Sequence, residues 1–182
     1  MGPVLGVTLR GIEAIPIDIE VEITGGLFTI AVVGLPDTAV KEARERVRAA
    51  LRANGINLRG RIAMNLAPAD LPKVGSLLDL PMAVGLARES GAVNVAEPSL
   101  FLGELAMDGR LRGTKGAVPA ALLARKMGVP LYIPPENARE VSLVKDVRAF
   151  AAADLAVLLA HLRGESPLPA VQATDGECEE QK

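Results

Sequence analysis

The side chains best suited to chemistry surround a single serine, Ser76. Lys73 lies three residues before it, and Lys115 follows later in the chain. A desolvated lysine can act as a general base toward a serine hydroxyl, so either lysine could activate Ser76 as a nucleophile. Asp70 and Asp79 flank the segment and are typical of turns and helix caps. The segment therefore predicts a Ser-Lys site, a phosphate-binding loop at a helix N-terminus, or an ordinary surface loop.

A second candidate site is a series of basic residues on a helix predicted at 37–54. Its members recur every three or four residues, which places them on one helix face. A line of guanidinium groups can follow a phosphate backbone. Glu42 and Glu45 interrupt the series, and Glu42 is placed to pair with Arg46, so a merely solvated face is the alternative. The candidate DNA-binding residues are Lys41, Arg44, Arg48, Arg52, Arg59 and Arg61.

Several function classes are excluded by residues that the sequence lacks. It has one histidine, His161, and one cysteine, Cys178, so a His-based triad, a zinc knuckle and a CxxC redox pair have no partners. No GxxxxGK[ST] loop is present, and no GxGxxG stretch lies between a strand and a helix. With 2% aromatic residues, the chain also lacks the rows of stacked rings typical of single-strand binders. We expect no cofactor and no metal site in this chain.

Apolar periodicity predicts the elements that must position these candidates. Alternation over 12–23 predicts a strand with one apolar and one acidic face, and Gly25-Gly26 predicts a turn into a returning hairpin strand at 27–33. Asp37 is the expected cap of the helix that follows. This mixture favours an α+β fold or two-layer sandwich over a doubly wound sheet. Further strands are expected at 4–9, 61–67, 100–105, 110–112, 131–133 and 147–149, and further helices at 79–90, 117–127 and 154–163.

The charge distribution predicts a folded domain at 1–164 followed by a tail. The 182 residues carry a formal net charge of -2. Residues 165–182 hold five carboxylates against one lysine, with two prolines and little apolar content. We expect them to form a disordered acidic tail or a linker. Without a long apolar run or a signal peptide, the sequence predicts a cytoplasmic protein with no membrane span.

Several strings of residues are distinctive: GLPDTAVKE at 34–42, NLAPADLPK at 65–73, DLPMA at 79–83, GEL at 103–105, GAVPAA at 116–121 and IPPEN at 133–137. They resemble the N-terminal domain of the ComM/YifB family of magnesium-chelatase-like AAA+ proteins, over about residues 1–164. That domain is similar to the proteolytic domain of Lon, a two-layer βα sandwich of the ribosomal protein S5 domain 2 type. The resemblance implies this α+β fold, a homo-oligomer, and a separate AAA+ module that binds ATP and magnesium and acts on DNA by branch migration during natural transformation.

The resemblance also bears on the Ser-Lys site. Lon-type enzymes hold their nucleophile in a Gly-Pro-Ser-Ala-Gly segment and its lysine partner in a later helix. Matching the segment at 72–79 puts Leu77 at the serine position, and matching 116–121 puts Val118 at the lysine position. The resemblance therefore implies a non-catalytic Lon-like domain that serves assembly and contact with DNA. A Lon-type peptidase that uses Ser76 with Lys73 or Lys115 is the alternative.

Overall fold

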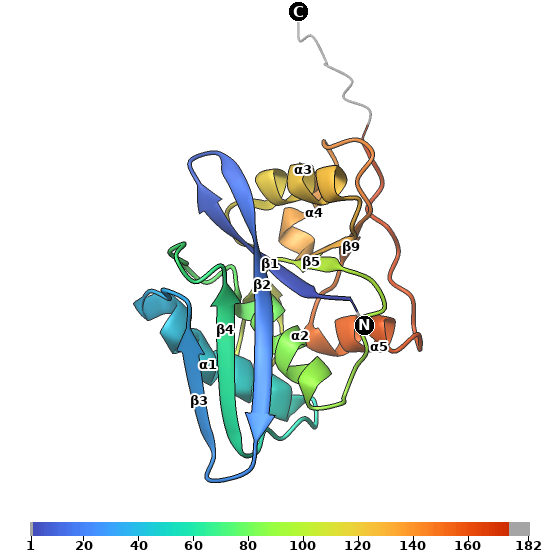
Figure 1. Cartoon of the computed structure of the whole chain (residues 1–182). Coiled ribbons are helices and arrows are strands. Elements are labelled where there is room, and N and C mark those ends of the chain that lie inside the picture. The colour runs from blue at the N-terminus through green and yellow to red at the C-terminus, as the bar shows by residue number, and fades with distance from the viewer. Residues whose placement is uncertain (1, 175–182) are drawn as a thin grey trace, which may run out of the picture.

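A seven-stranded mixed sheet organises the fold, which a computed structural model describes for residues 2–174 (Figure 1). The strand order is β3-β4-β2-β1-β5-β8-β9, and four of the six neighbouring pairs are parallel. A separate two-stranded sheet joins β6 to β7. The strands are β1 (Val4–Arg10), β2 (Glu13–Thr24), β3 (Thr29–Val33), β4 (Arg61–Ala67), β5 (Ser99–Phe101), β6 (Glu104–Leu105), β7 (Leu111–Arg112), β8 (Leu131–Ile133) and β9 (Ala149–Ala151).

Helices cover one face of the first three strands of this order. In Figure 1 α1 and α2 lie behind β3, β4 and β2, and the alternate residues that face them, such as Ile19 and Met64, are fully buried. The opposite sides of the same strands carry exposed residues such as Glu20 and Ala63. This arrangement confirms the predicted α+β sandwich. The helices are α1 (Thr38–Ala53), α2 (Asp79–Glu89), α3 (Ala117–Met127), the 3-10 turn η1 (Pro135–Asn137), α4 (Ala138–Val141) and α5 (Leu155–Leu162).

The hairpin predicted from the Gly25-Gly26 turn is wrong. The chain does reverse there, but β2 and β3 are not neighbours, because β4 lies between them. β4 pairs antiparallel with β2, so that Met64 lies opposite Val21, and it pairs parallel with β3, so that Ile62 lies opposite Ile30. Both strands thus hydrogen-bond to a later segment instead of to each other, about thirty residues further along the chain for β3 and about forty for β2. A local turn signal cannot reveal such an inserted partner.

The residues just after α5 are attached to the domain. The Leu168 N–H donates to Nδ1 of His161 at 2.8 Å, and the Val171 N–H donates to the Ala149 carbonyl at 2.7 Å. The Thr174 hydroxyl then bonds to that of Ser142 at 2.6 Å. Residues 165–174 therefore form a strap against the folded domain and not a disordered tail. Residues 175–182, which hold four of the five carboxylates of the predicted acidic tail, lie outside the described residues.

No helix in the described part of the chain is long and apolar enough to cross a membrane. The predicted strand at 147–149 lies two residues later, as β9. The single strand expected at 100–105 divides into β5 and β6, which belong to different sheets.

Candidate functional site

Lys73, the lysine nearest to Ser76, is buried in the structure. Its side chain is fully shielded from solvent, and its ammonium donates a hydrogen bond to the carbonyl of Pro68. Burial lowers the pKa of Lys73, and the nearby carboxylate of Asp70 opposes that shift. The main chain of Lys73 is also engaged, because its N–H donates to Leu35 at 3.0 Å and its carbonyl accepts from Asp37 at 2.9 Å. Lys73 therefore fastens the loop at 68–75 onto the segment before α1.

Asp37 completes this attachment from the other side. One of its carboxylate oxygens accepts the Val40 N–H at 2.8 Å, which confirms the predicted helix cap. The other oxygen accepts the Gly75 N–H at 3.1 Å. Gly34 precedes this turn with φ 101°, and a Cβ there would lie 2.3 Å from the Leu66 carbonyl oxygen, so only glycine fits. The strings at 34–42 and 65–73 thus form one interlocked structure.

Asp79 makes a buried ion pair across the helix layer. Its carboxylate is 1% exposed and accepts two bonds from Arg46, at 2.9 Å and 3.1 Å, and one from the Leu105 N–H at 3.1 Å. Burial raises the pKa of Asp79, and the bonds from Arg46 and Leu105 oppose that shift. The predicted cap role for Asp79 and the predicted pair of Arg46 with Glu42 are therefore wrong, because Asp79 joins α2 to α1 and to β6.

The sequence did contain a signal for this ion pair. Arg46 lies two residues from Arg44 and from Arg48, so it projects from nearly the opposite side of α1. That side also carries the buried residues Val47 and Ala50. An arginine on the buried side of an amphipathic helix requires an acidic partner, because an unpaired buried charge is costly.

The structure does not join Ser76 to either lysine. Ser76 is half-buried, and among residues 2–174 its hydroxyl forms no hydrogen bond with Lys73 or with the exposed Lys115. Leu77, which the resemblance matches to the Lon nucleophile, is buried in the hydrophobic core, and Val118, which it matches to the lysine, packs against the same core. Aliphatic side chains at these positions contribute packing and cannot transfer a proton.

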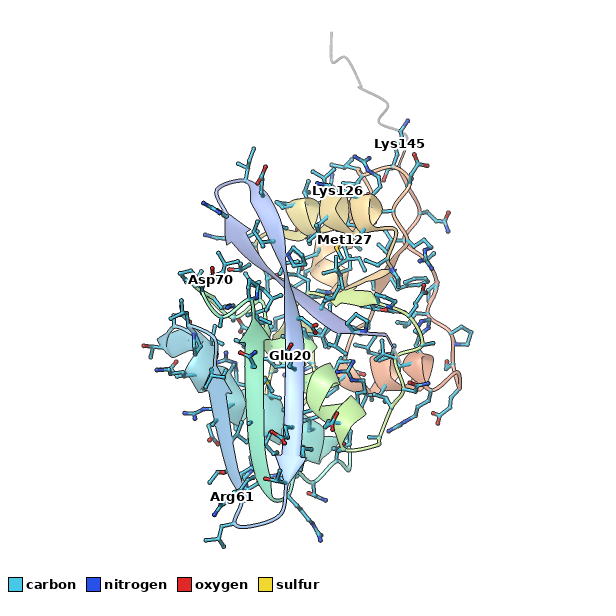
Figure 2. All side chains as sticks on the ribbon, in the orientation of Figure 1. Glu20, Arg61, Asp70, Lys126, Met127 and Lys145 are labelled. Atoms are coloured by element: carbon cyan, nitrogen blue, oxygen red, sulfur yellow. The ribbon has the colours of Figure 1, made fainter. Side chains whose placement is uncertain are left out.

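A cleft of about 660 Å³ lies between the end of β1 and the loop at 68–75. Figure 2 shows Asp70 on this loop, which follows β4. Among the described lining residues, Asp70 and Arg10 supply the charges. The one hydroxyl in the lining, that of Thr8, donates to the Pro72 carbonyl at 3.3 Å. The cleft can therefore receive a polar group or an extended segment, but its lining offers no free nucleophile.

The basic residues of α1 are divided between the scaffold and the surface. Arg44 donates to the carbonyls of Lys41 at 2.8 Å and Ile30 at 3.0 Å, so it covers the outer edge of β3. The guanidinium of Arg48 lies over the ring of Phe28, 4.2 Å from its centroid. Within the predicted DNA-binding set, the exposed residues are Lys41, Arg48, Arg52, Arg59 and Arg61. Their contact with DNA stays a prediction.

A third attachment is made by Asn137, the last residue of the string at 133–137. The side-chain amide of Asn137 donates to the Thr114 carbonyl at 2.9 Å, and its oxygen accepts the Thr114 N–H at 3.1 Å. The turn before α3 is thereby tied to η1. Across residues 2–174, no group of three or more His, Cys, Asp or Glu side chains is arranged to hold a metal ion.

These attachments connect the strings by which the sequence resembles a known family. Comparison with known proteins independently identifies a family. A family model described as subunit ChlI of Mg-chelatase matches residues 19–137, which is more than half of the chain. The chain belongs to this family. The matched region of this ChlI-family chain begins within β2 and ends with η1, so it includes all three attachments.

Relatives of the ChlI-family chain carry the names YifB and ComM. The uncharacterized protein YifB of Salmonella typhimurium is 44% identical over 168 residues, and that of Escherichia coli is 41% identical over 168 residues. The competence protein ComM of Haemophilus influenzae is 41% identical over 162 residues. These alignments cover 91%, 91% and 87% of the chain but only 33%, 33% and 32% of the relatives. The chain thus spans about a third of the length of the curated relatives it matches.

Proposed function

We propose that this chain is a binding and assembly domain, without peptidase or ATPase activity of its own, in a longer ComM-type AAA+ protein that remodels DNA by branch migration. The observation that carries the proposal is the position of Lys73. A general base must reach its nucleophile, whereas the Lys73 ammonium is buried and bonded to Pro68. The aliphatic residues at the two Lon-type positions, Leu77 and Val118, support the same reading.

The proposal assigns chemistry to a different part of the protein. The relatives are about three times as long as the matched region. On this proposal their remaining length holds the AAA+ module, which binds ATP and magnesium, and the present domain helps to hold copies of the protein together. The protein works in the cytoplasm, where DNA is available to it.

Direct contact with DNA is a second candidate role. It is favoured by the exposed cations of α1 and of the segment that follows, namely Lys41, Arg48, Arg52, Arg59 and Arg61. Arg44 is a weaker candidate, because two of its donors are already bonded to main-chain carbonyls. Lysine and arginine contacts to phosphate release counterions, so such binding weakens steeply as salt is raised.

Two measurements on the purified chain test these roles. Peptide hydrolysis should be undetectable, and hydrolysis that is lost in Ser76→Ala would contradict the non-catalytic assignment. Fluorescence anisotropy with duplex and branched DNA at two salt concentrations tests the second role. If α1 contacts DNA, replacing Lys41, Arg48 and Arg52 with alanine lowers affinity and flattens the salt dependence. Lys126→Ala on α3 is the matched control for loss of a surface cation.

A further inference from the structure

The uncovered face of the sheet carries a column of carboxylates. Asp18, Glu20 and Glu22 alternate along β2 on the side away from α1 and α2, and Figure 2 shows Glu20 on this open side. Their neighbours across β4 are small or neutral, because Ala63 lies opposite Glu22 and Asn65 opposite Glu20. These side chains leave a shallow hollow of about 220 Å³ between β2 and β3. The small side chains of β4 therefore leave room for a helix to pack on this surface, beside the carboxylates of β2.

The outer side of α1 carries a matching column of arginines. Arg44, Arg48 and Arg52 recur every four residues. The guanidinium of Arg48 lies over the ring of Phe28, and its N–H groups can still donate to a partner. The described residues offer Arg48 no hydrogen bond. Because Arg44 is already bonded to Ile30 of β3 and Arg48 lies on Phe28, an acidic partner would have little side-chain entropy to remove from them.

The two columns also agree in spacing. Alternate residues on one side of a strand are about 6.8 Å apart, and residues four apart on a helix are about 6 Å apart. Three carboxylates can therefore face three guanidinium groups in register. From this match we infer that a second copy of this chain docks the arginine column of its α1 onto the carboxylate column of β2.

The remaining charges favour a protein partner over DNA. Glu45 lies beside Arg44 and Arg48 in a hollow on the outer side of α1, where it would repel phosphate. Arg61 lies at the start of β4 (Figure 2), and the strand register places it one row from Glu22. A second copy of the chain can pair charges of both signs, because its Glu45 can bind Arg61 of the first copy while its arginines bind the carboxylates of β2. A uniformly negative duplex cannot do so.

The contact joins two different surfaces, so it is heterologous. Such a contact repeats from copy to copy and closes into a ring when the rotation between copies allows it. The inference rests on the proposed assembly function and names the surfaces that would perform it.

Sedimentation equilibrium of the 182-residue chain at low and high salt tests the inference. We expect self-association that weakens with salt. Arg48→Glu with Arg52→Glu, and separately Glu20→Arg with Glu22→Arg, should each raise the dissociation constant by more than about tenfold. An equimolar mixture of the two variants should associate again, because each supplies the charge that the other has lost. Lys126→Glu, a reversal on α3, should leave association unchanged, and circular dichroism checks that every variant is folded.

Three outcomes overturn the inference. The first is a monomer at every concentration and salt, and the second is association that neither pair of reversals weakens. The third is an α1 variant that loses affinity for DNA while its association is unchanged, which would assign the arginine column to nucleic acid. Peptide hydrolysis dependent on Ser76 would remove the non-catalytic assignment without changing any of these sedimentation results, so the two failures are distinguishable.

Discussion

Two groups of charged side chains in this molecule are used in opposite ways. Around the loop at 68–75, Lys73, Asp37 and Asp79 are bonded to main-chain groups or to Arg46, inside the fold. Along the outer side of α1, exposed residues such as Arg52 remain turned to solvent. The distinctive strings of the sequence belong to the inner group. The residues most useful for identifying the family are therefore scaffold.

The largest effect expected from the inner group is that of Asp79→Ala. Removing this carboxylate leaves the Arg46 charge and the Leu105 N–H unpaired, and we expect a loss of about 3 kcal/mol in unfolding free energy. Urea denaturation measures it. The matched control is Asp108→Ala, which removes the exposed Asp108–Arg110 pair and should not measurably change stability. Equal effects of the two substitutions would erase the distinction between inner and outer charges.

Asp37→Ala should have the next largest effect. It removes a helix cap worth about 1 kcal/mol and a second bond, to the Gly75 N–H, worth about 1 kcal/mol more. Asp154 caps α5 through the Val157 N–H alone, so Asp154→Ala should cost about half as much in thermal or chemical denaturation. A cost for Asp37→Ala no greater than for Asp154→Ala would mean that the link to the loop adds no stability.

Lys73→Met separates the charge of this lysine from its packing. We expect a net loss of only about 1 kcal/mol, because the Pro68 carbonyl loses its donor while a buried charge is also removed. Burial lowers the pKa of Lys73 below its ordinary value of 10.5. Between the two values the unfolded chain binds more protons than the folded chain, so this group makes stability rise with pH there.

The methionine variant should lack that rise. Denaturation of both proteins at about pH 8 and about pH 10 measures the difference. Parallel pH profiles would indicate that the Lys73 ammonium is solvated, contrary to its position in the core.

The smallest effect concerns the outer group. Arg48→Ala removes the guanidinium from the ring of Phe28 and should cost about 0.5 kcal/mol. Arg52→Ala should cost less, because the described residues give Arg52 no comparable contact. Differential scanning calorimetry of the two variants compares them directly. A large loss in either case would place α1 arginines among the scaffold residues and would weaken their assignment to a partner.

The sequence predicted the helices and strands better than it predicted which strands pair. The prediction of α1 rested on the helical spacing of Val40, Val47 and Leu51 and on the cap residue Asp37. These are local signals, which lie within one stretch of the chain. The pairing of β3 failed because its partner, β4, lies beyond the whole of α1. Glycines at 25 and 26 favour the same turn whether β2 and β3 pair directly or have another strand between them.

The candidate site was predicted less well for a related reason. Lys73 lies between Pro72 and Val74 in a loop with two prolines, an aspartate and a glycine, a composition typical of exposed turns. Its burial depends on the segment before α1, which closes over it through Leu35 and Asp37. The match of Leu77 and Val118 to Lon-type positions comes from the family resemblance and stays a prediction.

The strand order has a consequence for the way in which the chain acquires its structure. β1 and β2, which are made first, occupy the middle of the sheet, and β1 obtains its second neighbour only when β5 has been made. Loops of this length must close before the central strands are paired on both sides, and such distant pairings slow folding. Until then β1 keeps an unpaired edge that can recruit other chains. We therefore expect the nascent domain to need protection from aggregation until the residues of β5 have been synthesised.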